Sequence, residues 1–440
     1  MFPNMSTRVR FAPSPTGQVH IGNIRAAIFN WLFARHEGGR FLLRIEDTDR
    51  ERSTPEALEA VMAAMNWLGL EPDEPPLFQS TRTDAHIAAA EQLLSNGLAF
   101  KEDKGGTGKG DCVIFRMPAG TDSEFDDIIK GRLTKKAEDM KDFVIVRSDG
   151  SPVFHLANVV DDIFMGITHV IRGDDHVENT FRHIALYKAL GADVPRYAHL
   201  PMIVNAQGKP YSKRDGDAYV GDFRQKGYYA DALFNYLSLL GWSPGDDREQ
   251  LTRQELTDAF TLERVRSSAS QMDLKKLTFL NGRYLADMSA ADFETAASAY
   301  AGSPDWLQAG KAARFSEVCR LLQSRTKTLA DVREWTYFFD RMPAYEQKAV
   351  DKLLRKEGVG VMLSAFVQKL GVVGFDHDSI ESALRAAEAE AGLKEGKLNQ
   401  PVRVSITGIT TGAGICETML LLGKDSVIAR LTHAATNLCG

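Results

Sequence analysis

The sequence predicts an α/β protein that has a parallel sheet in its front half and helices in its back half. Strand and helix patterns alternate through the first seventy residues and again between about 170 and 205, which is typical of a parallel sheet with crossover helices. From about residue 220 onward, apolar residues recur almost wholly at helical spacing. The 440 residues are about three times the length of a typical domain, so we expect two to four domains.

The first elements are a strand, a tight loop, a helix and a second strand. Residues 8–12 form the first strand candidate, which Pro13, Pro15 and Gly17 end. Residues 41–45 form an apolar second strand. Thr54 and the following proline begin a second helix that ends near residue 68. The first helix is recognised by apolar residues at three- and four-residue steps: Ile24, Ala27, Ile28, Trp31 and Leu32.

Residues 100–150 interrupt this alternation and predict an insertion with short strands of its own. A segment rich in glycine and lysine, 104–110, precedes strand candidates at 112–117 and 143–147. Its Gly-Lys step lacks the first glycine and the final hydroxyl of a phosphate-binding P-loop, so we interpret it as a flexible loop. A glycine-rich stretch at 408–414 predicts a turn between C-terminal helices. After the insertion, the alternation of strands and helices resumes. The resumed elements are a strand at 170–172, a helix at 177–190 and a strand at 202–205.

Composition excludes several classes of protein. A hydrophobic content of 44% and a charged content of 25% argue against disorder, collagen and coiled coils. The net charge of -6 argues against a histone-like surface, although a local basic patch can still bind nucleic acid. No apolar run is long enough for a membrane helix, and the N-terminus lacks a secretory signal. The four scattered cysteines predict a cytoplasmic protein without structural zinc, disulfides or another metal site of its own.

A twelve-residue block between the first strand and the first helix is the strongest motif. Residues 12–23 read Ala-Pro-Ser-Pro-Thr-Gly-Gln-Val-His-Ile-Gly-Asn. Ligands bind open α/β sheets beyond the carboxyl ends of the strands, and a helix N-terminus at that place favours phosphate. His20 and Asn23 can donate hydrogen bonds to phosphate oxygens, and Gly22 allows close approach. The block therefore predicts a nucleotide site.

This block resembles the first nucleotide-binding motif, called HIGH, of class I aminoacyl-tRNA synthetases, in the form of the glutamyl and glutaminyl branch. Residues 209–216, Lys-Pro-Tyr-Ser-Lys-Arg-Asp-Gly, resemble the second motif, KMSKS, although Pro210 stands where the family usually has its first lysine. Residues 44–50 and 155–162 resemble the glutamyl enzymes. The match covers most of the chain, and the sequence resembles the bacterial type of glutamyl-tRNA synthetase.

The resemblance implies a Rossmann-type parallel-sheet catalytic domain with an α+β insertion, followed by all-α C-terminal domains. It places the catalytic domain at 1–83 together with 161–192, and an inserted domain that binds the tRNA acceptor end at 84–160. A connecting domain at 193–294 would contact the tRNA stem and carry the second motif. Residues 295–440 would form a helical anticodon-binding region.

The resemblance also assigns roles to individual residues. His20 and Lys213 would be catalytic, aligning substrates and stabilising charge on the phosphates. Phe154 departs from the family, which commonly has tyrosine there, and so removes one donor to the substrate carboxylate. The residues expected to bind ATP are Thr16, His20, Gly22, Asn23, Asp175, Ser212, Lys213 and Arg214. The residues expected to bind glutamate are Arg10, Ala12, Ser14, Glu46, Phe154, Asn158 and Arg172.

The implied activity is ATP-dependent ligation of L-glutamate to tRNA(Glu) through a glutamyl-adenylate. Mg²⁺ would accompany the ATP, and the protein is expected to be a monomer that binds no membrane. Three alternatives were weighed: a glutaminyl enzyme, whose relatives carry a β-barrel tail; a shortened relative without an anticodon region; and a catalytically silent tRNA-binding paralogue. Only Phe154 and Pro210 favour the last.

Overall fold

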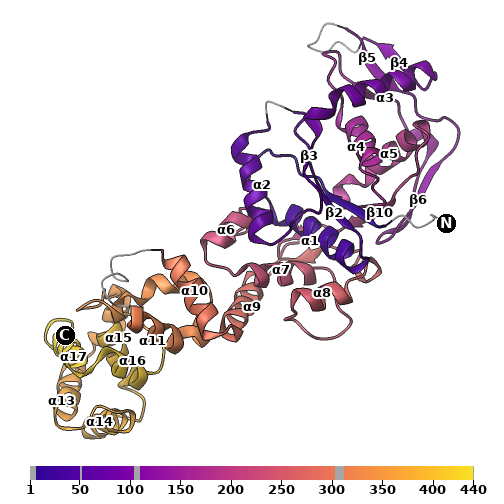
Figure 1. The fold of residues 1–440 in the computed structure, drawn as a ribbon. Coiled ribbons are helices and arrows are strands. Elements are labelled where there is room, and N and C mark those ends of the chain that lie inside the picture. Colours follow the sequence, from indigo (N-terminus) through magenta and orange to yellow (C-terminus); the bar gives the residue numbers. More distant parts are fainter. Residues whose placement is uncertain (1–5, 50–51, 104–109, 303–311, 440) are drawn as a thin grey trace. The chain divides into compact units, whose positions relative to one another are not determined.

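The computed structural model describes residues 6–49, 52–103, 110–302 and 312–439 (Figure 1). The chain divides into two compact units. Unit 1 comprises Met1–Gln225 and Ala230–Leu277, and unit 2 comprises Lys226–Tyr229 and Thr278–Gly440. Of the sequence-derived features, the segment 104–109 lies outside the described residues. The division into four domains stays a prediction.

Unit 1 begins with the alternation that the sequence predicts. The first two strands pair in parallel, Arg8 opposite Arg40, and the second pairs in parallel with the third. The second helix starts as expected at Thr54, whose hydroxyl accepts a hydrogen bond from the amide of Ala57 at 3.2 Å. The elements are β1 (Arg8–Phe11), α1 (Ile21–His36), β2 (Arg40–Ile45), α2 (Pro55–Trp67), β3 (Leu77–Phe78) and the 3₁₀ turn η1 (Gln79–Arg82).

A second sheet, whose parallel strands come from later in the chain, lies beside the first. The strands β9 and β10 pair in parallel, and the Thr168 amide donates to the Arg8 carbonyl at 2.9 Å, which sets β9 beside β1. Helix α1 packs on β1, β2 and β9. The predicted α/β class is confirmed. The elements are α4 (Phe154–Phe164), β9 (His169–Gly173), η3 (Asp174–His176), α5 (Val177–Ala189) and β10 (Arg196–Leu200).

The predicted strands of the insertion are present, but the insertion also contains a hairpin that the sequence did not indicate. Strand β6 of the hairpin pairs in parallel with β10, Asp127 opposite Tyr197, so the hairpin joins the catalytic sheet. Its strand Ser-Glu-Phe-Asp-Asp carries a single apolar residue and no clear alternation. The elements are α3 (Thr83–Ser95), β4 (Ala99–Glu102), β5 (Cys112–Phe115), β6 (Ser123–Asp127), β7 (Gly131–Lys135), η2 (Ala137–Asp139) and β8 (Phe143–Val146).

Unit 1 ends in a small parallel strand pair and a group of helices. The loop between β11 and α6 carries the second motif, residues 209–216. The elements are β11 (Ile203–Val204), α6 (Val220–Gln225), α7 (Ala230–Leu239), α8 (Arg253–Ala259), η4 (Leu262–Arg264), β12 (Ser270–Gln271) and the start of α9 (Leu274–Asp287).

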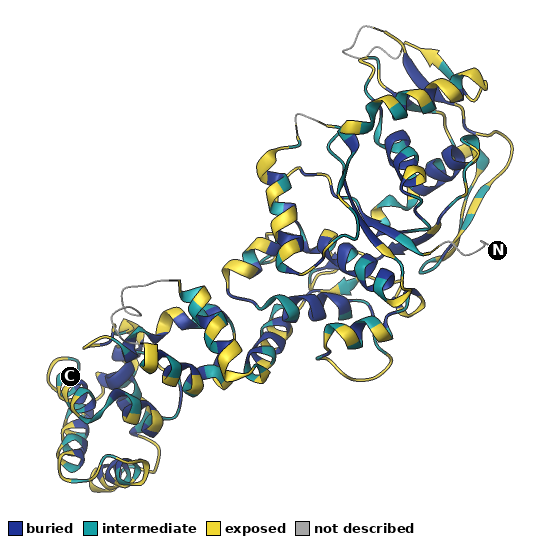
Figure 2. Ribbon diagram, viewed as in Figure 1, coloured by how far each residue is buried: buried dark blue, intermediate teal, exposed yellow. Residues whose placement is uncertain are grey.

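Unit 2 is helical, as predicted, and residues 278–302 and 312–439 contain no strand. Figure 2 shows its helices with buried inner faces and exposed outer faces. The core includes Leu363, Phe366 and Leu431. The predicted turn at 408–414 lies between α15 and α16. The elements are α10 (Ala290–Ala301), α11 (Ala312–Leu322), η5 (Gln323–Arg325), η6 (Leu329–Phe338), α12 (Gln347–Ala349), η7 (Val350–Leu354), α13 (Val359–Val372), α14 (His377–Glu390), α15 (Asn399–Thr407), α16 (Ile415–Leu422) and α17 (Lys424–Asn437).

Among the described residues, no helix has both the length and the apolar character that crossing a membrane requires.

A close backbone approach at the start of β2 gives a test of the packing of unit 1. A methyl group on Gly39 would lie 2.2 Å from the carbonyl oxygen of Thr7, which also accepts the Arg40 amide. We expect Gly39→Ala to destabilise the protein by about 1–3 kcal/mol, measured as a lower urea midpoint. Gly221→Ala is the control, because its added methyl group would meet no atom within 4 Å. Equal midpoints for both variants would contradict the prediction.

Candidate active site

The first part of the site is the N-terminus of α1. His20 caps the helix: its Nδ1 accepts a hydrogen bond from the Gly22 amide at 3.1 Å. A methyl group on Gly22 would lie 3.3 Å from the same nitrogen, so a glycine there leaves room for the ring. Burial lowers the pKa of His20 from its ordinary value, against an opposing hydrogen bond with the backbone of Tyr211. The ring is therefore neutral at pH 7, with Nδ1 as acceptor and Nε2 protonated.

The second motif forms a turn organised by one carboxylate. Asp215 accepts from the amide and the hydroxyl of Ser212, both at 2.9 Å, and from the Asn205 side-chain amide at 2.7 Å. The hydrogen bonds from Asn205 and Ser212 hold the pKa of Asp215 below its usual range. This turn leaves Lys213 and Arg214 exposed. Both cations are thus available to an anionic ligand.

Tyr219 brings the two motifs together. Its ring meets the His20 ring edge-on at 6.1 Å between centroids, and the Lys213 ammonium lies 5.8 Å from the centre of the same ring. The backbones of His20 and Tyr219 also form an isolated bridge, supported by the Ile21 amide donating to Ala218 at 2.9 Å. His20 and Lys213, which are 193 positions apart in the sequence, are therefore neighbours of one residue that sequence reasoning missed.

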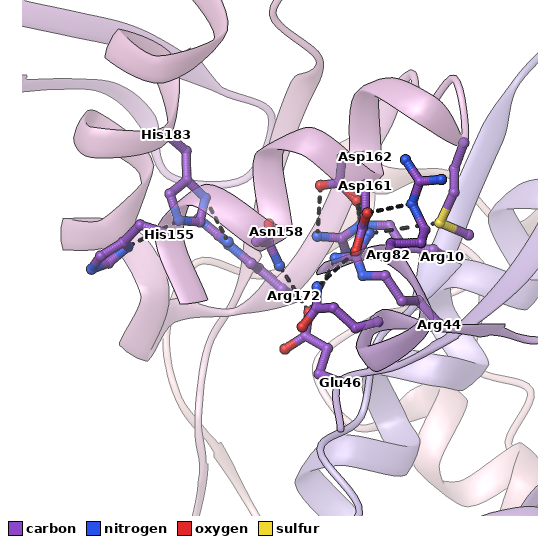
Figure 3. A network of polar contacts seen from close by, with 12 residues as sticks. Arg10, Arg44, Glu46, Arg82, His155, Asn158, Asp161, Asp162, Arg172 and His183 are labelled. Atoms are coloured by element: carbon purple, nitrogen blue, oxygen red, sulfur yellow. Dashed lines mark hydrogen bonds and ion pairs between the residues drawn. The ribbon is translucent and has the colours of Figure 1, made fainter. Parts of the chain in front are cut away.

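A buried network of charges forms the second part of the site (Figure 3). Asp162 on α4 accepts from Arg10 Nε at 3.0 Å and Nη2 at 3.3 Å, and it also pairs with Arg44. All three side chains are at most 3% exposed. Burial opposes the ionisation of Asp162, but the charges of Arg10 and Arg44 keep its pKa below the usual range. Both guanidiniums therefore have an ionised partner.

Glu46 and Asn158 extend this network. Glu46 Oε1 accepts from Arg44 Nη2 at 3.1 Å and from Asn158 Nδ2 at 2.9 Å. Asn158 Oδ1 is buried and has no hydrogen-bond partner in the structure. Because a buried acceptor without a partner is costly, this oxygen is a natural place for a ligand donor. A carboxylate beside a free carbonyl oxygen suits an ammonium group.

Arg172 is a buried cation of the site for which no acidic partner is found among the described residues. It lies at the carboxyl end of β9, is 8% exposed, and has no carboxylate within ion-pair distance among the described residues. Its Nη2 donates to Thr180 Oγ1 at 2.7 Å and to the His176 carbonyl at 3.3 Å. Burial lowers its pKa, but a guanidinium in a protein keeps its charge. A buried charge without a counter-charge favours an anionic ligand.

Phe154 begins α4 and lies among three histidines. Its ring centroid is 5.4–5.9 Å from those of His155, His176 and His183. Burial and the nearby charges of Arg182 and Arg172 lower the pKa of His155 to about 4, and burial and Arg172 lower that of His183. These rings are neutral at pH 7. Phe154 thus contributes an aromatic wall without a donor.

The other residues expected at the site lie on loops, in the first turn of α1 or in η3. The Pro13 carbonyl accepts from the Glu46 amide at 3.0 Å, which holds the first motif against the buried network. Asp175 is exposed, and its carboxylate lies 3.6 Å from His176 Nε2. No hydrogen bond or ion pair in the structure brings Asp175 to His20 or Lys213. The half-buried or exposed residues are Ala12, Ser14, Thr16 and Arg214 on loops and Asn23 in the first turn of α1.

Two residues in the network were quoted in motif segments but received no role from the sequence. Arg44 is fully buried on β2, and Asp162 lies one helical turn after Asn158 on α4. An acid four residues after a site residue lies on the same face of a helix, and that spacing could have identified Asp162.

Among the described residues, no group of three or more His, Cys, Asp or Glu is placed to hold a metal ion.

The shared carboxylate gives a test of the network. Asp162→Asn would leave buried Arg10 without an ionised partner and Arg44 with Glu46 alone, so we expect a loss of about 3–5 kcal/mol in unfolding free energy, measured by urea denaturation. Asp126→Asn is the control, because the Asp126–Arg132 pair is exposed and should matter little. A midpoint for Asp162→Asn equal to that of the control would contradict the prediction.

Comparison with known proteins places this geometry among the aminoacyl-tRNA synthetases. A family model described as "tRNA synthetases class I (E and Q), catalytic domain" matches residues 6–106 and 101–279. A second, described as "Anticodon binding domain", matches residues 292–435.

Individual relatives match along nearly the whole chain. Glutamate–tRNA ligase 1 of Granulibacter bethesdensis is 40% identical, over 97% of this chain and 97% of the relative. Glutamate–tRNA ligase 1 of Gluconacetobacter diazotrophicus is 41% identical, over 98% of this chain and 100% of the relative. The crystal structure of a glutamate tRNA ligase from Elizabethkingia meningosepticum, in complex with its amino acid, has a TM-score of 0.83 and 28% identity, covering 99% of this chain and 100% of that one.

Proposed function

The chain belongs to the class I tRNA synthetases of the E and Q branch and is a glutamate–tRNA ligase, and we propose a division of the reaction among its residues. The resemblance drawn from the two motifs is thereby confirmed. The reaction uses ATP to activate L-glutamate and then transfers glutamate to tRNA(Glu). The roles given below to single residues are our proposal.

Arg172 binds a carboxylate of glutamate. The observation that carries this role is its buried guanidinium, which has no acidic partner among the described residues and is held by neutral groups. Arg10 is also in this region, but Asp162 already neutralises its charge. Arg10 therefore supports the shape of the site and adds less attraction for an anion than Arg172 does.

Glu46 and Asn158 bind the glutamate ammonium. The support is a carboxylate beside a buried amide oxygen that has no partner. Ser14 is on the loop whose Pro13 carbonyl accepts from the Glu46 amide, and this contact supports a role for Ser14 beside Glu46. Phe154 and Ala12 would complete the pocket as apolar walls.

His20 and Lys213 act on the ATP phosphates. The glutamate α-carboxylate attacks the α-phosphorus of ATP, the bond to the β-phosphate oxygen breaks, and pyrophosphate leaves. Negative charge accumulates on the phosphate oxygens, so aligned donors lower the barrier. The support is the arrangement around Tyr219, in which the neutral His20 ring keeps its Nε2 hydrogen and Lys213 is exposed.

The remaining ATP contacts follow the two motifs. Gly22 leaves space at the helix N-terminus, and the exposed Arg214 adds a second cation beside Lys213. Ser212 is bonded to Asp215, which shapes the turn. The other residues proposed to contact ATP are Thr16, Asn23, Ser212 and Asp175.

Mg²⁺, a cytoplasmic location and a monomeric state complete the proposal. Mg²⁺ retains waters and is commonly bound by substrate phosphates, so it would arrive with the ATP and need few protein ligands. The four cysteines are free thiols, as is usual in a reducing compartment.

In the second step of the reaction, the tRNA ribose hydroxyl attacks the adenylate carbonyl, giving glutamyl-tRNA and AMP.

Charging of tRNA tests the substrate. With total bacterial tRNA, ATP and labelled amino acid, we expect the full-length protein to charge glutamate and not glutamine. The measurement is acid-precipitable label on tRNA, with tRNA omitted as the control. Label from glutamine alone would overturn the choice of amino acid, and no label from either, with folded protein, would overturn the activity.

Lys213→Ala tests the proposed phosphate contact. Loss of a donor to developing charge should lower the single-turnover rate of activation by about 10²–10³-fold, while tRNA affinity measured by filter binding changes little. Lys188→Ala is the matched control, because Lys188 is also exposed but lies at the end of α5. An activation rate like that of the control would remove Lys213 from this role.

A further inference from the structure

We propose that His199, oriented by Asp127, is a positioning residue that aims Arg172 at the carboxylate of glutamate. The inference rests on the proposed role of Arg172. It concerns two buried residues of β10 and β6 to which neither motif gives a function. Neither side chain is exposed to solvent.

The contacts form a continuous chain from a carboxylate to the guanidinium. Asp127 Oδ2 is 2.6 Å from His199 Nδ1. On the other side of the imidazole, His199 Nε2 is 3.3 Å from Arg172 Nε and 3.0 Å from Thr180 Oγ1. Thr180 also accepts from Arg172 Nη2 at 2.7 Å. His199 and Thr180 thus hold one edge of the guanidinium.

Asp127 selects the tautomer of His199 that this arrangement needs. Burial acts to raise the pKa of Asp127, but hydrogen bonds from His199 and from the backbone of Lys130 and Ile129 hold it below its usual range. An ionised carboxylate only accepts, so Nδ1 carries the hydrogen. Burial lowers the pKa of His199 and keeps the ring neutral. Nε2 therefore has a lone pair directed at the Arg172 and Thr180 donors.

Packing keeps the imidazole in this orientation. The Tyr197 and His199 rings are stacked, with centroids 5.9 Å apart and planes 5° from parallel. The His199 amide also donates to Asp127 Oδ2 at 3.1 Å. A ring fixed on one face and at both nitrogens has little freedom to rotate.

The arrangement explains how a guanidinium is kept buried and yet available. A direct Arg172–carboxylate pair would occupy the donors that a substrate needs. Placing Asp127 beyond the imidazole offsets the buried positive charge at longer range and leaves Arg172 without an acidic contact. The carboxylate is supplied by the β6–β7 hairpin, which explains why that hairpin is paired with the catalytic sheet.

Asp127→Asn is the most direct variant. Oδ1 accepts from the amides of Ile129 at 2.9 Å and Lys130 at 2.8 Å, so the asparagine oxygen should occupy that position. Its NH₂ group then faces His199 Nδ1, which becomes an acceptor, and Nε2 gains the hydrogen. Two donors, Nε2–H and Arg172 Nε–H, would then face each other in nearly unchanged packing.

The readout is the KM for glutamate in aminoacylation, compared with the KM for ATP and with kcat. For Asp127→Asn we expect the KM for glutamate to rise about tenfold or more, with the KM for ATP within about threefold of wild type. A general loss of folding would lower the apparent kcat and the thermal midpoint without a selective rise in the KM for glutamate. Wild-type protein that fails to charge glutamate would count against the proposed function, whereas an unchanged KM for glutamate in the variant overturns only this inference.

A matched pair of variants at His199 separates positioning from structural support. The amide of glutamine reaches the position of Nε2 and can still accept from Arg172, whereas the amide of asparagine reaches the position of Nδ1 and keeps only the Asp127 contact. We expect His199→Asn to raise the KM for glutamate more than His199→Gln does. The reverse order, or equal values, overturns the proposal, and if these variants do not fold, the Asp127→Asn result alone decides it.

Discussion

The site depends on one buried carboxylate shared by two buried guanidiniums. Asp162 on α4 pairs with Arg10 on β1 and Arg44 on β2, and so joins two neighbouring strands to the helix that follows the insertion. Burying any of these ions alone would be very costly, so both guanidiniums depend on Asp162, and Arg44 is also paired with Glu46. The strand ends and α4 are therefore held at one relative position. That position is the floor of the proposed glutamate site.

The arginines of the site differ in whether an acidic side chain of the protein neutralises them. The two cations Arg10 and Arg44 are balanced by the two anions Asp162 and Glu46. Arg172, which has no acidic contact among the described residues, keeps its attraction for an anion. In the proposed role of Arg172, a neutral amide in place of the carboxylate would leave the buried charge uncompensated.

The insertion contributes to this site through the sheet. The β6–β7 hairpin pairs with β10, which in turn pairs with β9, so one strand separates this part of the insertion from the strand that carries Arg172. The β4–β5–β8 sheet of the same insertion has its own antiparallel pairing. One insertion thus holds both an independent small sheet and a strand of the catalytic sheet, and only the latter carries Asp127.

The sequence by itself determined the elements and the motifs. Apolar spacing located α1, because it reports directly which face of an element is buried, and the cap at Thr54 located α2. The strands predicted were β1, β2, β5, β8, β9 and β11, whereas β3, β4, β6, β7, β10 and β12 were not predicted. The twelve-residue block and the Ser-Lys-Arg turn identified the family, because short loops that bind phosphate have restricted sequences.

Only the tertiary structure decided which charges meet. Nothing in the local sequence relates Asp127 to His199, or Tyr219 to His20 and Lys213, because these contacts join residues on different elements. The weakly patterned β6 escaped detection for the same reason: its pairing with β10, and not its own alternation, makes it a strand. Periodicity records burial within one element, whereas the pairing of buried charges depends on the distances between elements, which the sequence alone does not state.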